Sequence, residues 1–210
     1  MLFDWVSECK NKSVLLLEGT DDCHIIKKFC EDGNIAVNFG FCNCRGDSNL
    51  LKQLSAFLLA NDNKDIIGVI LDADNNVDAR YQEIKDKVKK FYTLPEEMPK
   101  DGLVYTEKGQ PKLGIWIMPN NQDNGALEEF YLTLAIDIDT DFINDVITQA
   151  EGKNLTSFKS QHRKKAIMHT YFSWQDFPGS PLHASINKIA LDNNQDIAIA
   201  FSAWLVKLFH

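Results

Sequence analysis

The sequence predicts an α/β protein with a mostly parallel sheet and helices on both faces. The first observation is a set of short apolar segments, such as 13–18 and 67–71, which are typical of strands buried on both faces. The second is that segments with helical spacing of apolar residues alternate with these strands. With 210 residues and 44% hydrophobic residues, the chain can bury a sizeable core.

The elements of the first part of the chain follow from local pattern. In chain order we expect a strand over 13–18, a helix over 22–30, a strand over 35–41, a helix over 49–60, a strand over 67–71, a helix over 77–91, a strand over 113–118 and a helix over 126–134. Thr20 or Asp21 can cap the first helix, and Gly33 can end it. The proline-containing loop over 93–112 is expected to hold a short strand or hairpin near 103–105.

The chain beyond Asp137 shows no further strand pattern. The segments with helical spacing there are 139–150, 160–175, 182–191 and 195–209. We therefore expect a four-stranded α/β domain over residues 1–136 and a helical C-terminal part over 137–210 that packs on it.

Charge and cysteine content limit the functional classes. A net charge of −8 is not typical of a nucleic-acid-binding protein, although a local basic surface is compatible with it. The five cysteines include no CxxC pair, which favours reduced thiols in a cytoplasmic protein. A zinc site built from Cys42, Cys44 and His24 is the alternative. Neither a transmembrane segment nor a signal peptide is evident, so we expect a cytoplasmic location without membrane contact.

Acidic side chains follow three of the expected strands. Because ligands bind outside the carboxyl ends of strands in open parallel sheets, these side chains should converge on one edge. Converging carboxylates repel one another, and hard cations such as Mg²⁺ or Mn²⁺ offset that repulsion. Asp72 and Asp74 are two residues apart in an extended segment, so we expect both to face one ion. The candidate ligands are Glu18, Asp22, Asp72, Asp74, Asp123 and Glu128.

Each of these motifs, taken alone, can also have a purely structural role. The segment Asp72-Ala-Asp74 can be an Asx turn that caps the next helix, and Glu18-Gly19 can simply end a strand in a turn. The combination of acidic residues at the ends of several strands is more specific than either motif.

The segment "VLLLEGTDD" (14–22), followed about fifty residues later by "IIGVILDADNN" (66–76), resembles the Toprim domain. This acidic α/β module occurs in topoisomerases, primases, OLD-family nucleases and small ribonucleases that mature ribosomal RNA. A closer resemblance is to small stand-alone Toprim proteins, which carry a later segment of the form W-x-M-P-x-N…G…LE. Here that segment is Trp116–Asn121, Gly125 and Leu127-Glu128, so the resemblance covers residues 13–135.

The resemblance implies a Rossmann-like fold and roles for the acidic residues. Glu18 corresponds to the Toprim glutamate, a general acid/base or metal ligand, and Asp22 to the second acid of nuclease-type members. Asp72 and Asp74 correspond to the metal-binding DxD. Two departures are that Asn120 stands where an aspartate is expected, and that no Gly-Glu follows the DxD. Asp123 and Glu128 are the candidates for completing a second metal site.

These motifs favour a metal-dependent nuclease that hydrolyses DNA or RNA. The alternative is a non-catalytic module that binds Mg²⁺ with a nucleotide or nucleic acid and assists another protein, for example an ATPase in genome defence. A homo-oligomer is compatible with either. A haloacid-dehalogenase phosphatase fits poorly because its DxD lies on the first strand, and a dinucleotide-binding domain fits poorly because no GxGxxG is present.

A nuclease must also bind phosphates. Residues 152–170 contain no acid, and a helix there would present a positive face, although a solvated lysine surface is equally compatible. The candidate nucleic-acid-binding residues are Lys159, Arg163, Lys164 and Lys165, with Arg45 and Arg80 in the α/β domain. We expect Trp174 and Trp204 in the core because their neighbours are apolar at helical spacing.

Overall fold

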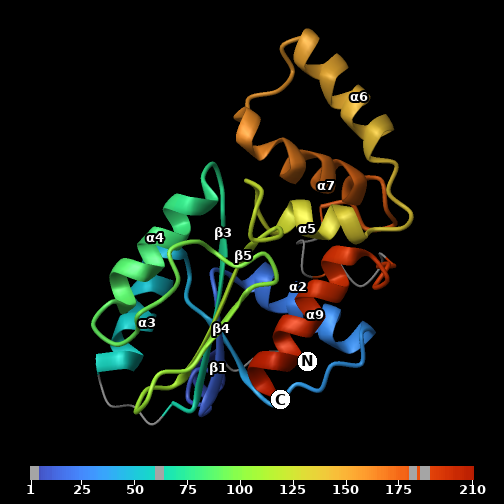
Figure 1. Cartoon of the computed structure of the whole chain (residues 1–210). Helices are drawn as coiled ribbons and strands as arrows, with labels where there is room; N and C mark the ends of the chain where they lie inside the picture. The colour runs from blue at the N-terminus through green and yellow to red at the C-terminus, as the bar shows by residue number, and fades with distance from the viewer. Residues whose placement is uncertain (1–4, 60–63, 180–183, 185–189) are drawn as a thin grey trace.

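The computed structural model describes residues 5–59, 64–179, 184 and 190–210 and shows a mixed α/β fold around one sheet (Figure 1). The sheet has five strands in the order β2-β1-β3-β5-β4. Its strands are β1 (Ser13–Leu17), β2 (Gly40–Asn43), β3 (Ile66–Asp72), β4 (Leu103–Tyr105) and β5 (Lys112–Met118). All neighbouring pairs are parallel except β4 and β5.

Helices cover both faces of this sheet, as Figure 1 shows. They are α1 (Trp5–Glu8), α2 (Thr20–Asp32), α3 (Asp47–Leu59), α4 (Val77–Val88), α5 (Leu127–Leu134), α6 (Thr140–Gly152), the 3₁₀ helix η1 (Ser160–His162), α7 (Arg163–Ser173) and α9 (Asp196–Phe209). β2, which follows β1 in the chain, lies on one side of β1. The later strands β3 and β5 lie on its other side. Because crossovers are right-handed, α2 lies on the opposite face from α3 and α4.

The predicted α/β class, the mostly parallel sheet and the helices on both faces are confirmed. The predicted number of four strands was wrong, because the short segment Leu103–Tyr105 pairs antiparallel with β5 as a fifth strand. The second strand was predicted over 35–41 but begins at Gly40. A Cβ at residue 40 would lie 2.0 Å from the carbonyl oxygen of Glu8, so the close packing of α1 on β2 requires glycine there.

The C-terminal helix α9 belongs to the core of the sheet. Trp204 is buried as predicted, contacts Trp116 with ring centroids 5.7 Å apart, and donates a hydrogen bond from Nε1 to the carbonyl of Leu103. Gly68 and Gly114 are partners in the register of β3 and β5, and both lie under Leu208 of α9. The missing side chains at these glycines let α9 approach the sheet.

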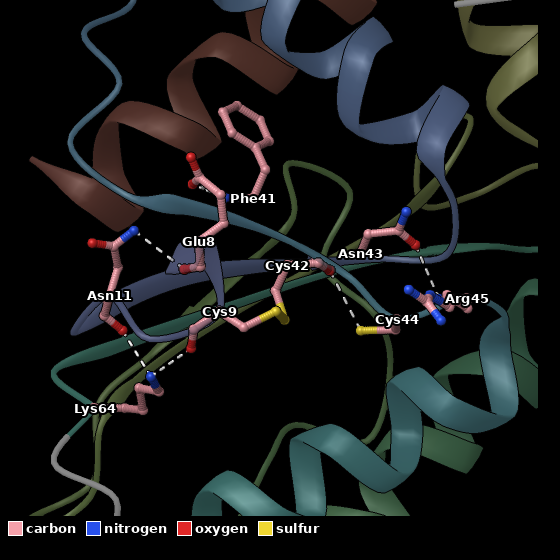
Figure 2. Close-up of a disulfide and its surroundings, with 9 residues drawn as sticks. All are labelled: Glu8, Cys9, Asn11, Phe41, Cys42, Asn43, Cys44, Arg45 and Lys64. Atoms are coloured by element: carbon pink, nitrogen blue, oxygen red, sulfur yellow. Dashed lines mark hydrogen bonds between the residues drawn. A yellow bond between two sulfur atoms is a disulfide. The ribbon is translucent and has the colours of Figure 1, made fainter. Parts of the chain in front are cut away.

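A disulfide joins Cys9, just after α1, to Cys42 on β2 (Figure 2). Beside it, the Glu8 carboxylate accepts a hydrogen bond from the backbone N–H of Phe41, 3.0 Å from Oε2. The prediction of reduced thiols was therefore wrong for this pair, because the fold brings α1 against the edge strand. It also removes Cys42 from the alternative zinc site, while Cys44 is a free thiol.

No helix in the described part of the chain is long and apolar enough to cross a membrane. The cytoplasmic location stays a prediction.

Replacing Gly114 by alanine should destabilise the fold, because the new Cβ would lie 2.2 Å from Cδ2 of Leu208. We expect a loss of about 1–3 kcal/mol in the free energy of unfolding, measured by urea denaturation. Gly152→Ala is the matched control, since a Cβ there has no neighbour within 4 Å. Equal stability of the two variants would contradict this account of α9 packing.

Replacing Cys9 by serine should lower the free energy of unfolding only under oxidising conditions. The disulfide closes a loop with a sequence separation of 33 residues, for which chain entropy predicts about 3–4 kcal/mol. In dithiothreitol, the wild type and Cys9→Ser should unfold at nearly the same urea concentration. A wild type whose midpoint does not respond to dithiothreitol would show that the bond does not form in solution.

Candidate functional site

The candidate site lies where β1 and β3 are neighbours but their connections leave in opposite directions. Such a switch point leaves a crevice at the carboxyl ends of the strands, where ligands bind in open α/β sheets. Glu18 follows β1 directly, and Asp72 is the last residue of β3. The backbone N–H of Asp72 donates to Oε1 of Glu18 at 3.0 Å, so the end of β3 orients the glutamate.

Asp72 is held in turn by the helix that follows β5. The backbone N–H of Leu127, the first residue of α5, donates to Oδ1 of Asp72 at 3.0 Å. Ala126, the residue before α5, has no polar side chain that could cap this helix. The carboxylate of Asp72, at the end of β3, is therefore the acceptor that caps the N-terminus of α5. Two backbone hydrogen bonds between Asp74 and Gly125 join the loops that carry these groups. The position of Asp72 is thus fixed from both sides.

An acidic cavity of about 260 Å³ opens at this point, and we call it the acidic cavity throughout. Its carboxylates come from the end of β1, the start of α2, the end of β3 and the start of α5. They are Glu18, Asp21, Asp22, Asp72 and Glu128. The structure therefore brings together four of the six predicted ligands.

Burial governs the protonation of these carboxylates. It raises the pKa of Glu18 to about 7, although the hydrogen bond from the Asp72 amide opposes the rise. Burial also raises the pKa of Asp22 to about 6, with help from the charge of Glu128. The pKa of Asp72 rises well above its ordinary value through burial and then through the charges of Glu18, Asp22 and Glu128. Burial of these carboxylates together thus disfavours their ionised forms, and a positive charge nearby would stabilise them.

Asp74 points away from this group. Its backbone has a φ of 51°, so the extended geometry that would put Asp72 and Asp74 on one side is broken. Nη2 of Arg80 lies 2.6 Å from Oδ2 of Asp74, and Nη1 of Arg80 contacts Asp47 at 3.1 Å and Glu83 at 3.0 Å. Arg80, predicted to contact phosphates, is thus occupied by three carboxylates.

A second cavity of about 420 Å³, here called the mixed cavity, adjoins the acidic one. Its walls are the loops after β3 and β5, the start of α5, η1 and the first turn of α7, and α7 lies above α5 in Figure 1. Three residues line both cavities: Asp72, Glu128 and Lys165. The two cavities therefore share one wall.

The predicted basic residues divide into two groups. Lys164 and Lys165 line the mixed cavity. Arg163 also lines it, but its guanidinium donates to both carboxylate oxygens of Glu151 and to the side chain of Asn144. Arg163 therefore anchors α7 to α6 rather than offering a free cation.

The remaining predicted residues lie outside the two cavities. Neither Arg45 nor Lys159 lines them among the described residues. Asp123 accepts a hydrogen bond from Nδ2 of Asn120 within the loop before α5. Trp174 was predicted in the core but is 50% exposed, because α7 ends at Ser173.

Ser160 and His162 line the mixed cavity but were not among the site residues predicted from the sequence. The only available signal was their place in the acid-free stretch 152–170. Their position over the acidic edge depends on how α7 folds back on α5, which local pattern does not predict.

Five carboxylates line the acidic cavity beside Lys165, and their oxygens are the kind of ligand that Mg²⁺ and Mn²⁺ prefer. Over residues 5–59, 64–179, 184 and 190–210, however, no three His, Cys, Asp or Glu side chains form a group that could hold an ion as they stand. Three of the carboxylates are instead bonded to protein groups: Glu18 to the Asp72 amide, Asp72 to the Leu127 amide, and Glu128 to Lys165. The donor chemistry fits a hard cation, and binding one requires these side chains to close around it.

The raised pKa of Glu18 predicts a pH dependence of stability. Between its ordinary value of 4.5 and about 7, the folded state holds the proton that the unfolded state has lost. Its contribution is therefore full below about pH 4.5 and is lost as the pH rises through about 7. In buffer free of divalent cations, we expect the wild type to lose roughly 2 kcal/mol more than Glu18→Gln between pH 5 and pH 8, measured by urea unfolding. Identical pH slopes for the two proteins would contradict the placement of Glu18.

Comparison with known proteins identifies a family for the chain. A family model described as "Protein of unknown function (DUF3226)" matches residues 12–210. No curated protein and no solved structure is significantly similar to the chain. Because the match spans the sheet, the acidic edge and the α6–α7 segment together, the chain belongs to the DUF3226 family.

Proposed function

We propose that the protein is a Mg²⁺- or Mn²⁺-dependent nuclease that hydrolyses phosphodiester bonds of DNA or RNA with a Toprim-type acidic site. The observation that carries this proposal is the shared wall between the acidic and the mixed cavity. One cavity has carboxylates that could bind a cation, and the adjoining one is lined by Lys164 and Lys165. A bound cation and nearby cationic side chains would both stabilise the negative charge that develops on a phosphodiester during hydrolysis.

A bound divalent cation would supply charge neutralisation and activation of a phosphate oxygen and of a water molecule. The residues that would hold it are Glu18, Asp22, Asp72 and Glu128, which already face one cavity. Backbone amides orient two of them: that of Leu127 donates to Asp72, and that of Asp72 donates to Glu18. The raised pKa values of Glu18, Asp22 and Asp72 support this assignment, because carboxylates buried together favour a cation that stabilises their ionised forms.

Glu18 is suited to accept a proton from the attacking water. The pKa of Glu18 is raised to about 7 in the metal-free protein, and a bound cation would lower it, so that Glu18 would be a carboxylate able to accept a proton at neutral pH. The hydrogen bond from Asp72 to Oε1 orients the carboxylate while leaving its second oxygen for this role. Lys164 and His162 in the mixed cavity would contact the substrate phosphate.

The resemblance to Toprim domains supports the same conclusion. The residues that carry it, Glu18 on one strand end and Asp72 on the next, are neighbours at the switch point of the sheet. The pairing of Asp74 with Arg80 is the feature that fits the pattern least.

That feature favours a second candidate, a non-catalytic module. With Asp74 bound to Arg80 and Glu128 to Lys165, the same edge could bind Mg²⁺ and a nucleotide or nucleic acid as the partner of another protein, such as an ATPase. In that case nucleic acid or nucleotide would bind without being cleaved.

The test is cleavage of single- and double-stranded DNA, RNA and tRNA in the presence of Mg²⁺ and of Mn²⁺. We expect the wild type to cleave at least one substrate, and Glu18→Gln and Asp72→Asn to lose about 10²-fold or more in rate. Asp86→Asn, an exposed carboxylate on α4 paired with Lys89, is the control and should cleave like the wild type.

A wild type that cleaves none of these substrates with either cation would contradict the nuclease proposal. Binding without cleavage, abolished by Asp72→Asn, would favour the non-catalytic module instead.

A further inference from the structure

Lys165 is the cationic side chain among the described residues that line the acidic cavity. Its Nζ lies 3.4 Å from Oε1 of Glu128, and its charge lowers the pKa of Asp22 against the effect of burial. A positive charge is therefore already present among the carboxylates. It stands where a metal ion would otherwise compensate them.

The exposed fractions of Lys165 and Glu128 show that the ammonium of Lys165 approaches the acidic cavity from the solvent side. The side chain of Lys165 is 55% exposed, whereas that of Glu128 is 15% exposed. The lysine thus reaches inward from α7 on a flexible four-carbon chain, and its ammonium can leave without opening the core. Arg163, two residues earlier, is instead fixed by Glu151 and Asn144.

The side chain of Lys165 also borders the mixed cavity. It lines the mixed cavity together with His162 and Lys164, whose charge acts on Glu129 of the same cavity. An ammonium that leaves Glu128 would join Lys164 there. Two neighbouring cations make a site that favours a dianionic or monoanionic phosphate.

We propose that Lys165 is a built-in counter-ion of the acidic cavity, which an entering divalent cation displaces from Glu128 into the mixed cavity, where it binds the substrate phosphate. This inference rests on the proposed metal site and adds to it the order of events. With a cation bound, Glu128 would serve as its ligand, and the ammonium of Lys165 would move away from it and add its charge to the phosphate site. Cation and phosphate therefore bind cooperatively, and the coupling is reciprocal.

The test is isothermal titration calorimetry with Mg²⁺ alone, inorganic phosphate alone, and phosphate in the presence of Mg²⁺. Lys165→Ala removes the competitor, so we expect it to bind Mg²⁺ about five- to tenfold more tightly than the wild type. It should also lose most of the gain in phosphate affinity that Mg²⁺ gives the wild type. Lys165→Arg should bind Mg²⁺ more weakly than the wild type, because a guanidinium holds a carboxylate with two hydrogen bonds.

Lys153→Ala is the matched control, since Lys153 is exposed beyond the end of α6 and lines neither cavity. It should behave like the wild type. Thermal unfolding of each variant shows whether the fold is intact.

Three outcomes would overturn the inference, and they are distinguishable from failure of the proposed function. If the wild type binds Mg²⁺ and Lys165→Ala binds it equally well, the metal site stands and the displacement is wrong. If Lys165→Ala binds Mg²⁺ more weakly, Lys165 supports the ligands rather than competing with the cation. If the wild type binds no Mg²⁺ at millimolar concentration, the proposed metal site fails and the displacement fails with it.

Discussion

The electrostatic repulsion among the carboxylates at the end of β1 and β3 is the constraint on which the rest of the site depends. Glu18, Asp22, Asp72 and Glu128 line one partly buried cavity, and burial raises the pKa of the first three. Such a group persists only if protons, backbone amides or cations compensate it. The amides of Asp72 and Leu127 donate hydrogen bonds to two of the carboxylates, and Lys165 contributes a positive charge. The raised pKa values mean that these carboxyl groups bind protons more readily than usual.

The scaffold makes this arrangement rigid where it must be rigid. Parallel pairing of β1 with β3 and of β3 with β5 sets three strand ends side by side, and α9 presses on the same strands through the glycine pair Gly68 and Gly114. By contrast, the basic wall stands on α7, which contacts α5 and is tied to α6 through Arg163. Glu18 and Asp72 are thus placed by the sheet, whereas Lys164 and Lys165 stand on α7.

Much of the fold was predictable from the sequence, and the predictions that were wrong have physical causes. The strands β1, β3 and β5 are continuous apolar runs, so their burial is evident from pattern alone. The shift of β2 to Gly40 came from a steric contact with Glu8, and the disulfide from the approach of Cys9 to Cys42. Both involve α1, a four-residue helix with too few residues to produce a recognisable pattern.

By itself, the sequence determined that acidic residues follow buried strands, and the carboxyl ends of parallel strands meet at one edge whatever the details of packing. That reasoning located Glu18, Asp22, Asp72 and Glu128. Only the tertiary structure decided which partner each side chain takes. Asp74 turned to Arg80 because its backbone is left-handed, and Lys165 reached Glu128 because α7 folds over α5. Periodicity and spacing describe the chain along its length, whereas these contacts depend on how distant segments cross in space.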